Sequence, residues 1–203
     1  MKKYYPENMS ATQLEEYKNY QIVKHRSKRN KMRSVSQYDS AWDKINTHLD
    51  DALEKINLIC LGTRNNYERD LFSKQINKHR ATDVYSLDIS PESGADYILD
   101  FNSLPDRWEN KWDAIFTNSI DHCIDPEKSL VSWMKTLKPS GVLLLMISRY
   151  DGEPTPSDCC VFDSGDISTM LKKISTMGEI IEVTDKKNCD ITVIIKKNKE
   201  PEE

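Results

Sequence analysis

The fold of this chain is decided by residues 56–68, which read INLICLGTRNNYE. An apolar run short enough for one buried strand ends at a single glycine, Gly62, and polar turn residues and a helical pattern follow it. The first N–H groups of a helix lack backbone partners, so a strand, a glycine turn and a helix start together favour an anionic ligand. The stretch lacks the second and third glycines of dinucleotide-binding and phosphate-binding loops, so the motif alone is weakly specific.

The composition indicates one soluble α/β domain with an appendage, because 203 residues can bury a substantial core and 31% of them are charged. The longest strongly apolar run, Val142 to Ile147, is too short to cross a bilayer, and the first residues show no apolar signal segment. The five cysteines have no metal-ligand spacing, so we expect no metal site. Cys60 and Cys123 should pack as small hydrophobic side chains, and a reducing, cytoplasmic location is favoured.

Positive charge gathers at the start of the chain. Residues 1–38 carry nine Lys and Arg against three Asp and Glu, whereas the whole chain has a net charge of −4. We therefore divide the chain into a basic N-terminal helical extension (1–38), a main domain (39–198) and a charged tail (199–203).

The most basic part of the extension, residues 24–33, has three interpretations. It is a solvated arm, a lid over an acceptor site, or a contact for RNA or another anionic partner. Nearby Tyr17, Tyr20 and Tyr38 offer rings for base stacking, but no RNA-binding module is recognisable.

Hydrophobic periodicity and capping signals predict alternating helices and strands. Ser10 and Gln13 form a capping-box pattern at a first helix, and a second helix should cover about 40–55 and lie against the sheet beside the first strand. Later helices should begin after Asn65, at Asp125-Pro126, and at Ser164 or Asp166. The expected strands are 56–61, 82–88, 95–100, 112–118, 142–147, 179–184 and 191–196.

This alternation predicts a doubly wound, mostly parallel, seven-stranded sheet. Ligands of such sheets bind beyond the carboxyl ends of the strands at the point where the strand order reverses, and the first strand with its glycine turn should lie there. Only residues 89–94 separate the second strand from the third, too few for a helical crossover. Either an irregular loop crosses there, or the third strand is shorter than its pattern indicates.

Short motifs follow one another at the strand ends and turns between about Ile56 and Ser148. They read Gly62-Thr63-Arg64 with Glu68, Leu87-Asp88-Ile89, Asp100-Phe101-Asn102-Ser103-Leu104-Pro105, WDAIFTNSIDH (112–122), Asp125-Pro126-Glu127, and Leu137-Lys138-Pro139-Ser140-Gly141. In this order they resemble the motifs of class I S-adenosylmethionine-dependent methyltransferases. The resemblance implies a Rossmann-like methyltransferase fold and S-adenosyl-L-methionine as cofactor. The chain departs from the family at Cys60, where many relatives carry an acid, and at Arg64 and Asn66, which replace later glycines.

The resemblance also implies where the nucleoside part of the cofactor binds. Asp88 would accept the two ribose hydroxyls, and Ile89 would lie against the adenine face. Asp100 and the backbone of Phe101 would bind the adenine amino group. The alternative for both acids is that each caps its own turn.

The amino-acid part of the cofactor should meet the glycine turn. Its carboxylate suits the N–H groups that follow Gly62, at Thr63 and Arg64, and the Arg64 side chain is either its ion-pair partner or solvated. Glu68 either contacts the cofactor amine or only completes the helix cap. Asn118, at the end of the fourth expected strand, is the last residue that we assign to the cofactor.

The loop after the fourth expected strand carries the candidate catalytic residues, Asp121 and His122. Methyl transfer is an in-line displacement, so an enzyme mainly aligns the nucleophile and excludes water, and a base is needed only where the acceptor must lose a proton. His122 is the best candidate base because free imidazole titrates near neutral pH, and a packing or hydrogen-bonding histidine is the alternative. Tyr150 and Asp151 are weaker candidates on the same rim.

Together these patterns predict an S-adenosylmethionine-dependent methyltransferase that acts on a small molecule or a glycan rather than on nucleic acid. The alternative is a non-catalytic module of the same fold, one that has lost the cofactor and binds RNA or a protein through its basic N-terminal segment. A nicotinamide-dependent oxidoreductase ranks third, because the G-x-G-x-x-G turn is missing.

Overall fold

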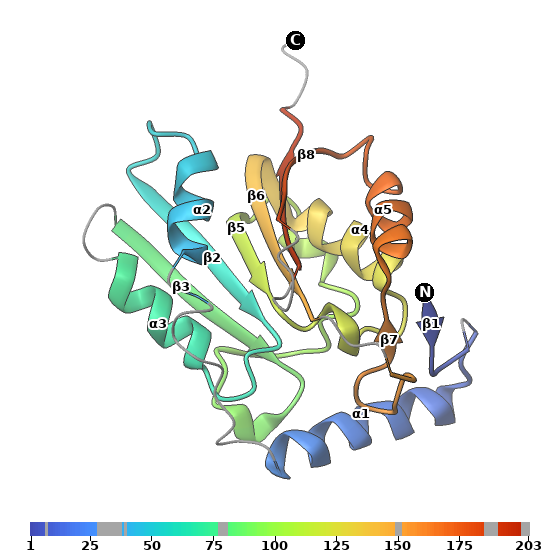
Figure 1. Cartoon of the computed structure of the whole chain (residues 1–203). Helices are drawn as coiled ribbons and strands as arrows, with labels where there is room; N and C mark the ends of the chain where they lie inside the picture. Colours follow the sequence, from blue (N-terminus) through green and yellow to red (C-terminus); the bar gives the residue numbers. More distant parts are fainter. Residues whose placement is uncertain are drawn as a thin grey trace.

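A seven-stranded sheet with helices on both faces forms the centre of the computed structural model (Figure 1). The structure describes residues 1–6, 8–27, 38, 40–76, 81–148, 152–184 and 191–199. The strands of the large sheet are β2 (Lys55–Leu61), β3 (Ala81–Asp88), β4 (Tyr97–Ile98), β5 (Trp112–Thr117), β6 (Leu137–Ile147), β8 (Gly178–Thr184) and β9 (Ile191–Lys197). The helices are α1 (Ala11–Ser27), α2 (Ala41–His48), α3 (Tyr67–Ile76), α4 (Pro126–Thr136) and α5 (Ser164–Lys172).

The strand order is β4-β3-β2-β5-β6-β9-β8, which confirms the expected doubly wound sheet of seven strands. The pairs from β4 to β6 are parallel, and β9 is antiparallel to both β6 and β8. Strand β2 pairs with β3 on one side and β5 on the other, so the order reverses at β2. The glycine turn that follows β2 therefore lies where an open α/β sheet binds its ligands.

Each face of the sheet has its own hydrophobic core. On one face α2 and α3 contribute Trp42, Ile45 and Phe72, and on the other α4 and α5 contribute many more side chains, among them Trp133 and Met170. Cys60 and Cys123 are fully buried in these cores, one in each, as expected of small hydrophobic side chains. Strands covered on both faces explain why β2 and β6 read as nearly continuous apolar runs.

The third strand shows how the chain crosses a short connection. A 3₁₀ turn (Pro91–Ser93), capped by the Ser90 side chain, takes the place of a crossover helix, and Gly94 turns the chain with a φ of 70°. Strand β4 then keeps only two of the six expected residues, Tyr97 and Ile98. Both alternatives left open by the sequence are therefore realised.

Two expected helices differ in their bounds. Helix α2 ends at His48 rather than near residue 55, because the backbone becomes extended at Leu49, and it packs mainly over β6 and β9 rather than beside β2. Helix α5 is capped by Asp163, not by Ser164 or Asp166. The Asp163 side chain accepts a hydrogen bond from the Asp166 N–H (2.7 Å), and the Asp166 side chain accepts one from the Asp163 N–H (3.1 Å).

The N-terminal segment is attached to the domain by a small second sheet. Strand β1 (Lys2–Lys3) pairs antiparallel with β7 (Cys160–Val161), and the N-terminal amine forms an ion pair with Asp166. From there α1 runs beneath the carboxyl ends of the central strands (Figure 1). Within the described ranges, the helices are all too short or too polar to cross a membrane.

Candidate cofactor and acceptor site

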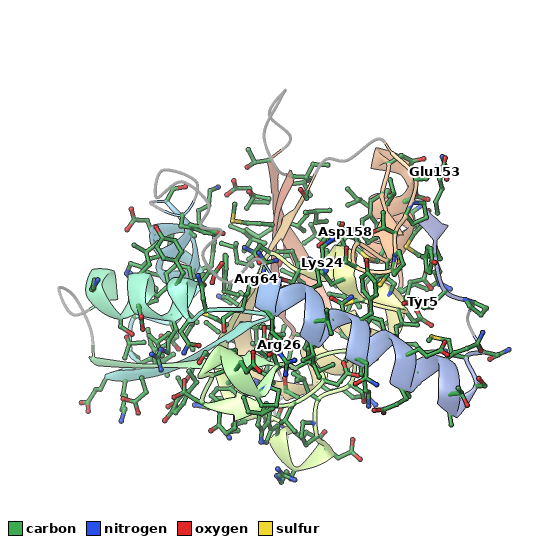
Figure 2. All side chains as sticks on the ribbon, turned by 90° about the horizontal axis from the view of Figure 1, so that it is seen from below. Tyr5, Lys24, Arg26, Arg64, Glu153 and Asp158 are labelled. Atoms are coloured by element: carbon green, nitrogen blue, oxygen red, sulfur yellow. The ribbon has the colours of Figure 1, made fainter. Side chains whose placement is uncertain are left out.

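A small cavity with room for about one water molecule lies between α1 and the carboxyl edge of the sheet. Figure 2 looks onto α1, which crosses this edge with Arg64 near its C-terminal end. Five of its lining residues are expected from the sequence: Gly62, Arg64, Ile89, Phe101 and His122. Three others are not expected there: Tyr17 and Gln21 from α1, and Ser119 from the loop after β5.

The turn after β2 has the backbone of a glycine-rich loop although it contains one glycine. Gly62 has a φ of 73°, and its N–H donates to the Leu87 carbonyl (2.8 Å). Arg64 and Asn66 stand where the resembling family has glycines, and both have left-handed backbones, with φ values of 48° and 59°. A side chain in this region typically costs about 1–2 kcal/mol, so the turn keeps its shape at the expense of backbone strain.

The strained turn is braced by side chains. Thr63 is buried, and its hydroxyl donates to Oδ1 of Asn66 (3.2 Å), while Nδ2 of Asn66 donates to the Gly94 carbonyl (2.7 Å). This links the turn after β2 to the turn before β4. Asn65 was expected to cap this helix, but α3 begins at Tyr67, so the cap position is Asn66. Asn65 instead accepts from the Tyr67 N–H (3.3 Å) in the turn just before the helix.

Asp88, the expected ribose ligand, is completely buried at the end of β3. Its Oδ2 accepts from the Arg64 N–H (2.8 Å), and its Oδ1 accepts from the Ser90 N–H (2.8 Å). The carboxylate thus caps two turns, which is the alternative role that the sequence left open for Asp88. Its contact with a ribose stays a prediction.

Glu68 lies in a polar network beneath the turn. Its Oε1 accepts from the Asn118 amide (3.2 Å) and the Tyr38 hydroxyl (3.3 Å), and Asn118 also donates to that hydroxyl (2.7 Å). Burial raises the pKa of the Glu68 carboxyl, and its hydrogen bonds and the Arg64 charge only partly oppose the shift. Asn118 was expected to bind the cofactor, and in the structure its amide donates to Glu68.

Two partly buried charged residues near the turn each keep one buried atom without a hydrogen bond to the described part of the chain. They are Nε of Arg64 and Oε2 of Glu68. Burying a polar atom without a partner costs about 1–3 kcal/mol, and Trp42, Asn46 and Trp112 keep such an atom elsewhere in the described chain.

Asp100 and Phe101 are also used within the protein. Oδ1 of Asp100 accepts from the backbone and the side chain of Asn102 (3.0 and 2.7 Å), and its Oδ2 lies 3.9 Å from Lys18 on α1. The Phe101 carbonyl accepts from the Trp133 indole (2.7 Å), and the Phe101 ring lines the cavity. Asp100 thus lies between its own loop and α1.

His122 is held with one ring nitrogen fixed. Its Nδ1 lies 2.6 Å from the Ser157 carbonyl, an atom that can only accept, so Nδ1 carries a proton. Its Nε2 faces Oδ1 of Asp121 (3.9 Å) and Oδ1 of Asp158 (3.8 Å). These three donor atoms lie within 4.8 Å of one another, a set that a divalent cation also accepts, although such clusters are common without one.

Some residues singled out in the sequence have other surroundings than expected, and others lie outside the described residues. Tyr17 and Tyr38 are 1% and 0% exposed, so their rings are core residues and not free for base stacking, whereas Tyr20 is 40% exposed. The basic positions 28–33 and the weaker candidates Tyr150 and Asp151 lie outside the described residues. Gln21 carried no signal in the sequence, because a polar residue of a polar helix marks no particular contact.

Comparison with known proteins adds a likeness of fold. Neither the scan of protein-family models nor the search of curated proteins finds a match. Among solved structures, the Burkholderia thailandensis 1,6-didemethyltoxoflavin-N1-methyltransferase with bound 1,6-didemethyltoxoflavin and S-adenosylhomocysteine is similar, with a TM-score of 0.69, 11% identity, and coverage of 97% of this chain and 94% of that one.

Two further solved structures are similar over most of their length. A SAM-dependent methyltransferase from Aquifex aeolicus gives a TM-score of 0.61 and 18% identity over 84% of this chain and 97% of that one. The [4+2]-cyclase SpnF gives a TM-score of 0.59 and 14% identity over 80% of this chain and 81% of that one. At these identities the likeness concerns the fold, and the chain has the Rossmann-like fold of class I methyltransferases.

The close packing at Gly62 leads to a stability prediction. A Cβ at this position would lie 2.7 Å from Oγ and 2.8 Å from Cβ of Ser119, on a backbone with a φ of 73°. Gly62→Ala should therefore lower the free energy of unfolding by about 2 kcal/mol or more, measured by denaturant titration. In a Ser119→Gly background the loss should shrink, since the clash is gone and only the backbone strain remains. Gly165→Ala, at a glycine without a positive φ, is the matched control. Equal losses of stability at both glycines would show that the loss at Gly62 does not come from its left-handed backbone and its contact with Ser119.

The raised pKa of Glu68 gives a pH-dependent prediction. The folded protein holds the proton of Glu68 more tightly than the unfolded chain, so this group's contribution to stability is full at low pH and is lost as pH rises through the folded pKa. Glu68→Gln should match wild type in melting temperature near about pH 4 and exceed it by about 2–4 °C near about pH 8. The exposed Glu109→Gln should show no such trend, and a Glu68→Gln advantage that is independent of pH would contradict the prediction.

Proposed function

We propose that this chain is an S-adenosylmethionine-dependent methyltransferase that binds its cofactor at the carboxyl ends of β2, β3 and β4. The observation that carries the proposal is the pair of buried atoms, Nε of Arg64 and Oε2 of Glu68, that keep no hydrogen bond within the described chain. A free amino acid group presents a carboxylate and an ammonium close together. A guanidinium and a carboxylate are the complementary partners of those two groups.

The pair fits the amino-acid end of the cofactor despite the departures in the glycine turn. The strand acid of many relatives is replaced by Cys60, and the Glu68 charge lies close enough to that thiol to raise its pKa further, after burial. Glu68, on α3, is the carboxylate that we assign to the role of the missing acid. The N–H groups of Thr63 and Arg64, expected from the sequence to meet the cofactor carboxylate, already donate to the Leu87 carbonyl (3.3 Å) and to Oδ2 of Asp88 (2.8 Å), so we assign that carboxylate to the Arg64 guanidinium.

The remaining assignments follow from the resemblance and from the cavity walls. Ile89 and Phe101 supply apolar surface for adenine, and both line the cavity. Asp100 would exchange its contact with Lys18 for the adenine amino group, and Asp88 would meet the ribose from the end of β3. Asn118 contributes by holding Glu68.

The chain's own chemistry at the acceptor is proton removal by His122. The bound cofactor supplies a methyl group on a sulfonium, which reacts readily with an aligned nucleophile. The Ser157 carbonyl holds the proton of His122 on Nδ1, so Nε2 is the atom that would take a proton from an acceptor hydroxyl. Asp121 and Asp158 lie close enough to stabilise the imidazolium that forms.

The acceptor that we propose is a small molecule or a glycan. The aromatic rings of Tyr17 and Tyr38 are buried rather than offered to bases. The Burkholderia enzyme of the same fold is described with a small heterocyclic molecule bound. We place the reaction in the cytoplasm, as the composition favours.

Binding of S-adenosylhomocysteine tests the cofactor site. Calorimetry should give a micromolar dissociation constant for the wild type, and Glu68→Gln and Asp88→Asn should each weaken binding by about ten-fold or more, as expected for loss of a charge-assisted hydrogen bond. Asp83→Asn, which alters an exposed carboxylate on the same strand as Asp88, should bind like wild type. Circular dichroism checks that each variant is folded. No heat with either the cofactor or its demethylated product would refute the methyltransferase.

A methyl-transfer assay tests His122. With S-adenosylmethionine and a panel of small hydroxyl-bearing acceptors and sugars, mass spectrometry should detect a methylated product. His122→Gln should lower kcat by about 100-fold or more while the affinity for S-adenosylhomocysteine is unchanged. As a control, the assay is repeated after a chelator has removed divalent metal ions, because Asp121, His122 and Asp158 could hold one. If His122→Gln retains full kcat, His122 is a hydrogen-bonding residue and not the base.

A further inference from the structure

The side chain of Lys111 ends in a cage of three aromatic rings. Its Nζ lies 4.5 Å from the ring centroid of Trp112, 4.6 Å from that of Trp108 and 5.0 Å from that of Tyr97. The face of an aromatic ring attracts a cation within about 6 Å of its centroid, and the indole face does so most strongly. Three ring faces around one nitrogen, two of them indoles, therefore form a site for a positive charge.

The rings of the cage hold one another in place. Trp108 and Trp112 are 3% and 0% exposed, and their rings meet edge to face with centroids 5.4 Å apart. Tyr97 packs edge to face against both indoles, and Tyr85 packs against the rings of Tyr97 and Trp112. These contacts do not involve Lys111. The cage is therefore preformed, which lowers the free energy that a ligand must supply to order its site.

The Lys111 ammonium is poorly matched to its surroundings in the cage. Its hydrogen bond to the Tyr97 hydroxyl is long (3.4 Å), and no carboxylate of the described residues forms an ion pair with it. An ammonium group has three N–H donors, and ring faces satisfy these less well than water or a carboxylate does. A nitrogen that carries methyl groups in place of N–H donors avoids this mismatch and keeps the positive charge.

The distances in the cage also suit a methylated nitrogen. A methyl carbon lies about 1.5 Å from its nitrogen and contacts ring carbons at about 3.5–4.0 Å. The nitrogen in the cage lies 4.5–5.0 Å from the three ring centroids. Methyl groups turned obliquely toward the rings therefore fit between the nitrogen and the ring faces.

Trp112 keeps a polar atom that packing alone does not require. The side chain is fully buried, and its Nε1 has no hydrogen-bond partner in the described part of the chain. A buried donor without an acceptor lowers stability, and a phenylalanine would fill much of the same space without that donor. The advantage of the indole at this position is its stronger attraction for a cation.

The cage is separate from the proposed cofactor site. Trp112 begins β5 and Thr117 ends it, so the cage lies toward the amino end of this strand, whereas α1 crosses the carboxyl ends (Figure 1). The Lys111 N–H donates to the carbonyls of Thr136 (2.9 Å) and Trp108 (3.1 Å), which fixes its main chain. The flexible side chain can therefore leave the cage without moving the rings.

We propose that the cage of Tyr97, Trp108 and Trp112 is a binding site for a trimethylammonium group and that Lys111 is its displaceable occupant. In the free protein the lysine ammonium takes the place of the ligand cation. When a ligand binds, the Lys111 side chain moves into water, which hydrates its N–H donors, and the methyl groups of the ligand contact the ring faces. A choline-like small molecule and the trimethylated lysine of a peptide present this same chemistry.

The test titrates the full-length protein with choline and, in a second arm, with a peptide that contains one trimethylated lysine. Binding is followed through the indole N–H signals in NMR spectra. Lys111→Ala should bind about five-fold tighter than wild type, because no occupant has to be displaced. Tyr97→Leu, which removes the least buried ring of the cage, should weaken binding by about five-fold or more. Tighter binding of choline would indicate a small-molecule ligand, and tighter binding of the peptide a protein ligand.

Two controls separate cation binding from other effects. Lys128→Ala removes an exposed lysine that contacts no ring of the cage, and it should bind like wild type. The neutral isostere of choline, with a quaternary carbon in place of the nitrogen, should bind about ten-fold more weakly, because it lacks the charge that the ring faces attract. Circular dichroism checks that each variant is folded.

Three outcomes would overturn the proposal. In the first, folded Lys111→Ala shows no saturable shift of the indole signals with either ligand. In the second, the neutral isostere binds as tightly as choline, so the rings act only as an apolar surface. In the third, mass spectrometry of the purified protein finds methyl groups on Lys111, which would make this lysine itself the permanent occupant of the cage.

Discussion

The buried Asp88 carboxylate holds together the two turns on which the candidate site depends. It accepts the Arg64 N–H on one oxygen and the Ser90 N–H on the other, at 2.8 Å each. A buried carboxylate is tolerated only when hydrogen bonds replace its water, and backbone N–H groups do so here. The left-handed backbone at Arg64 is thereby fixed from outside the turn.

The parts of the fold that the sequence predicts are those whose signal is local. The apolar runs of β2 and β6 and the Asp125-Pro126 start of α4 are each readable within a few residues. The two-residue β4 is shorter than its pattern, because the short connection of residues 89–94 limits how much of it can reach β3. Propensity describes what a segment can form, whereas pairing geometry decides how much of it does.

The parts of the site that the sequence does not predict are contacts between segments far apart in the chain. Tyr17 lies 105 residues from His122, and Gln21 lies 136 from Ser157, and neither position carries a motif. The pairing of Lys2–Lys3 with Cys160–Val161 has no hydrophobic pattern to reveal it. The replacement of two loop glycines by Arg64 and Asn66 is visible in the sequence, but their left-handed backbones follow from tertiary hydrogen bonds.

The fold by itself leaves the reaction open, since a [4+2]-cyclase and two methyltransferases share it with this chain. The function is narrowed by the places where the chain keeps features that lower its own stability. Backbone strain at two turn residues and two buried charged atoms without hydrogen bonds occur within five residues of one another, from Arg64 to Glu68. A structure stabilised for its own sake would replace them with glycine and an apolar side chain. Their position beside the end of β2, at the strand-order reversal, supports the charged ligand that we propose for that place.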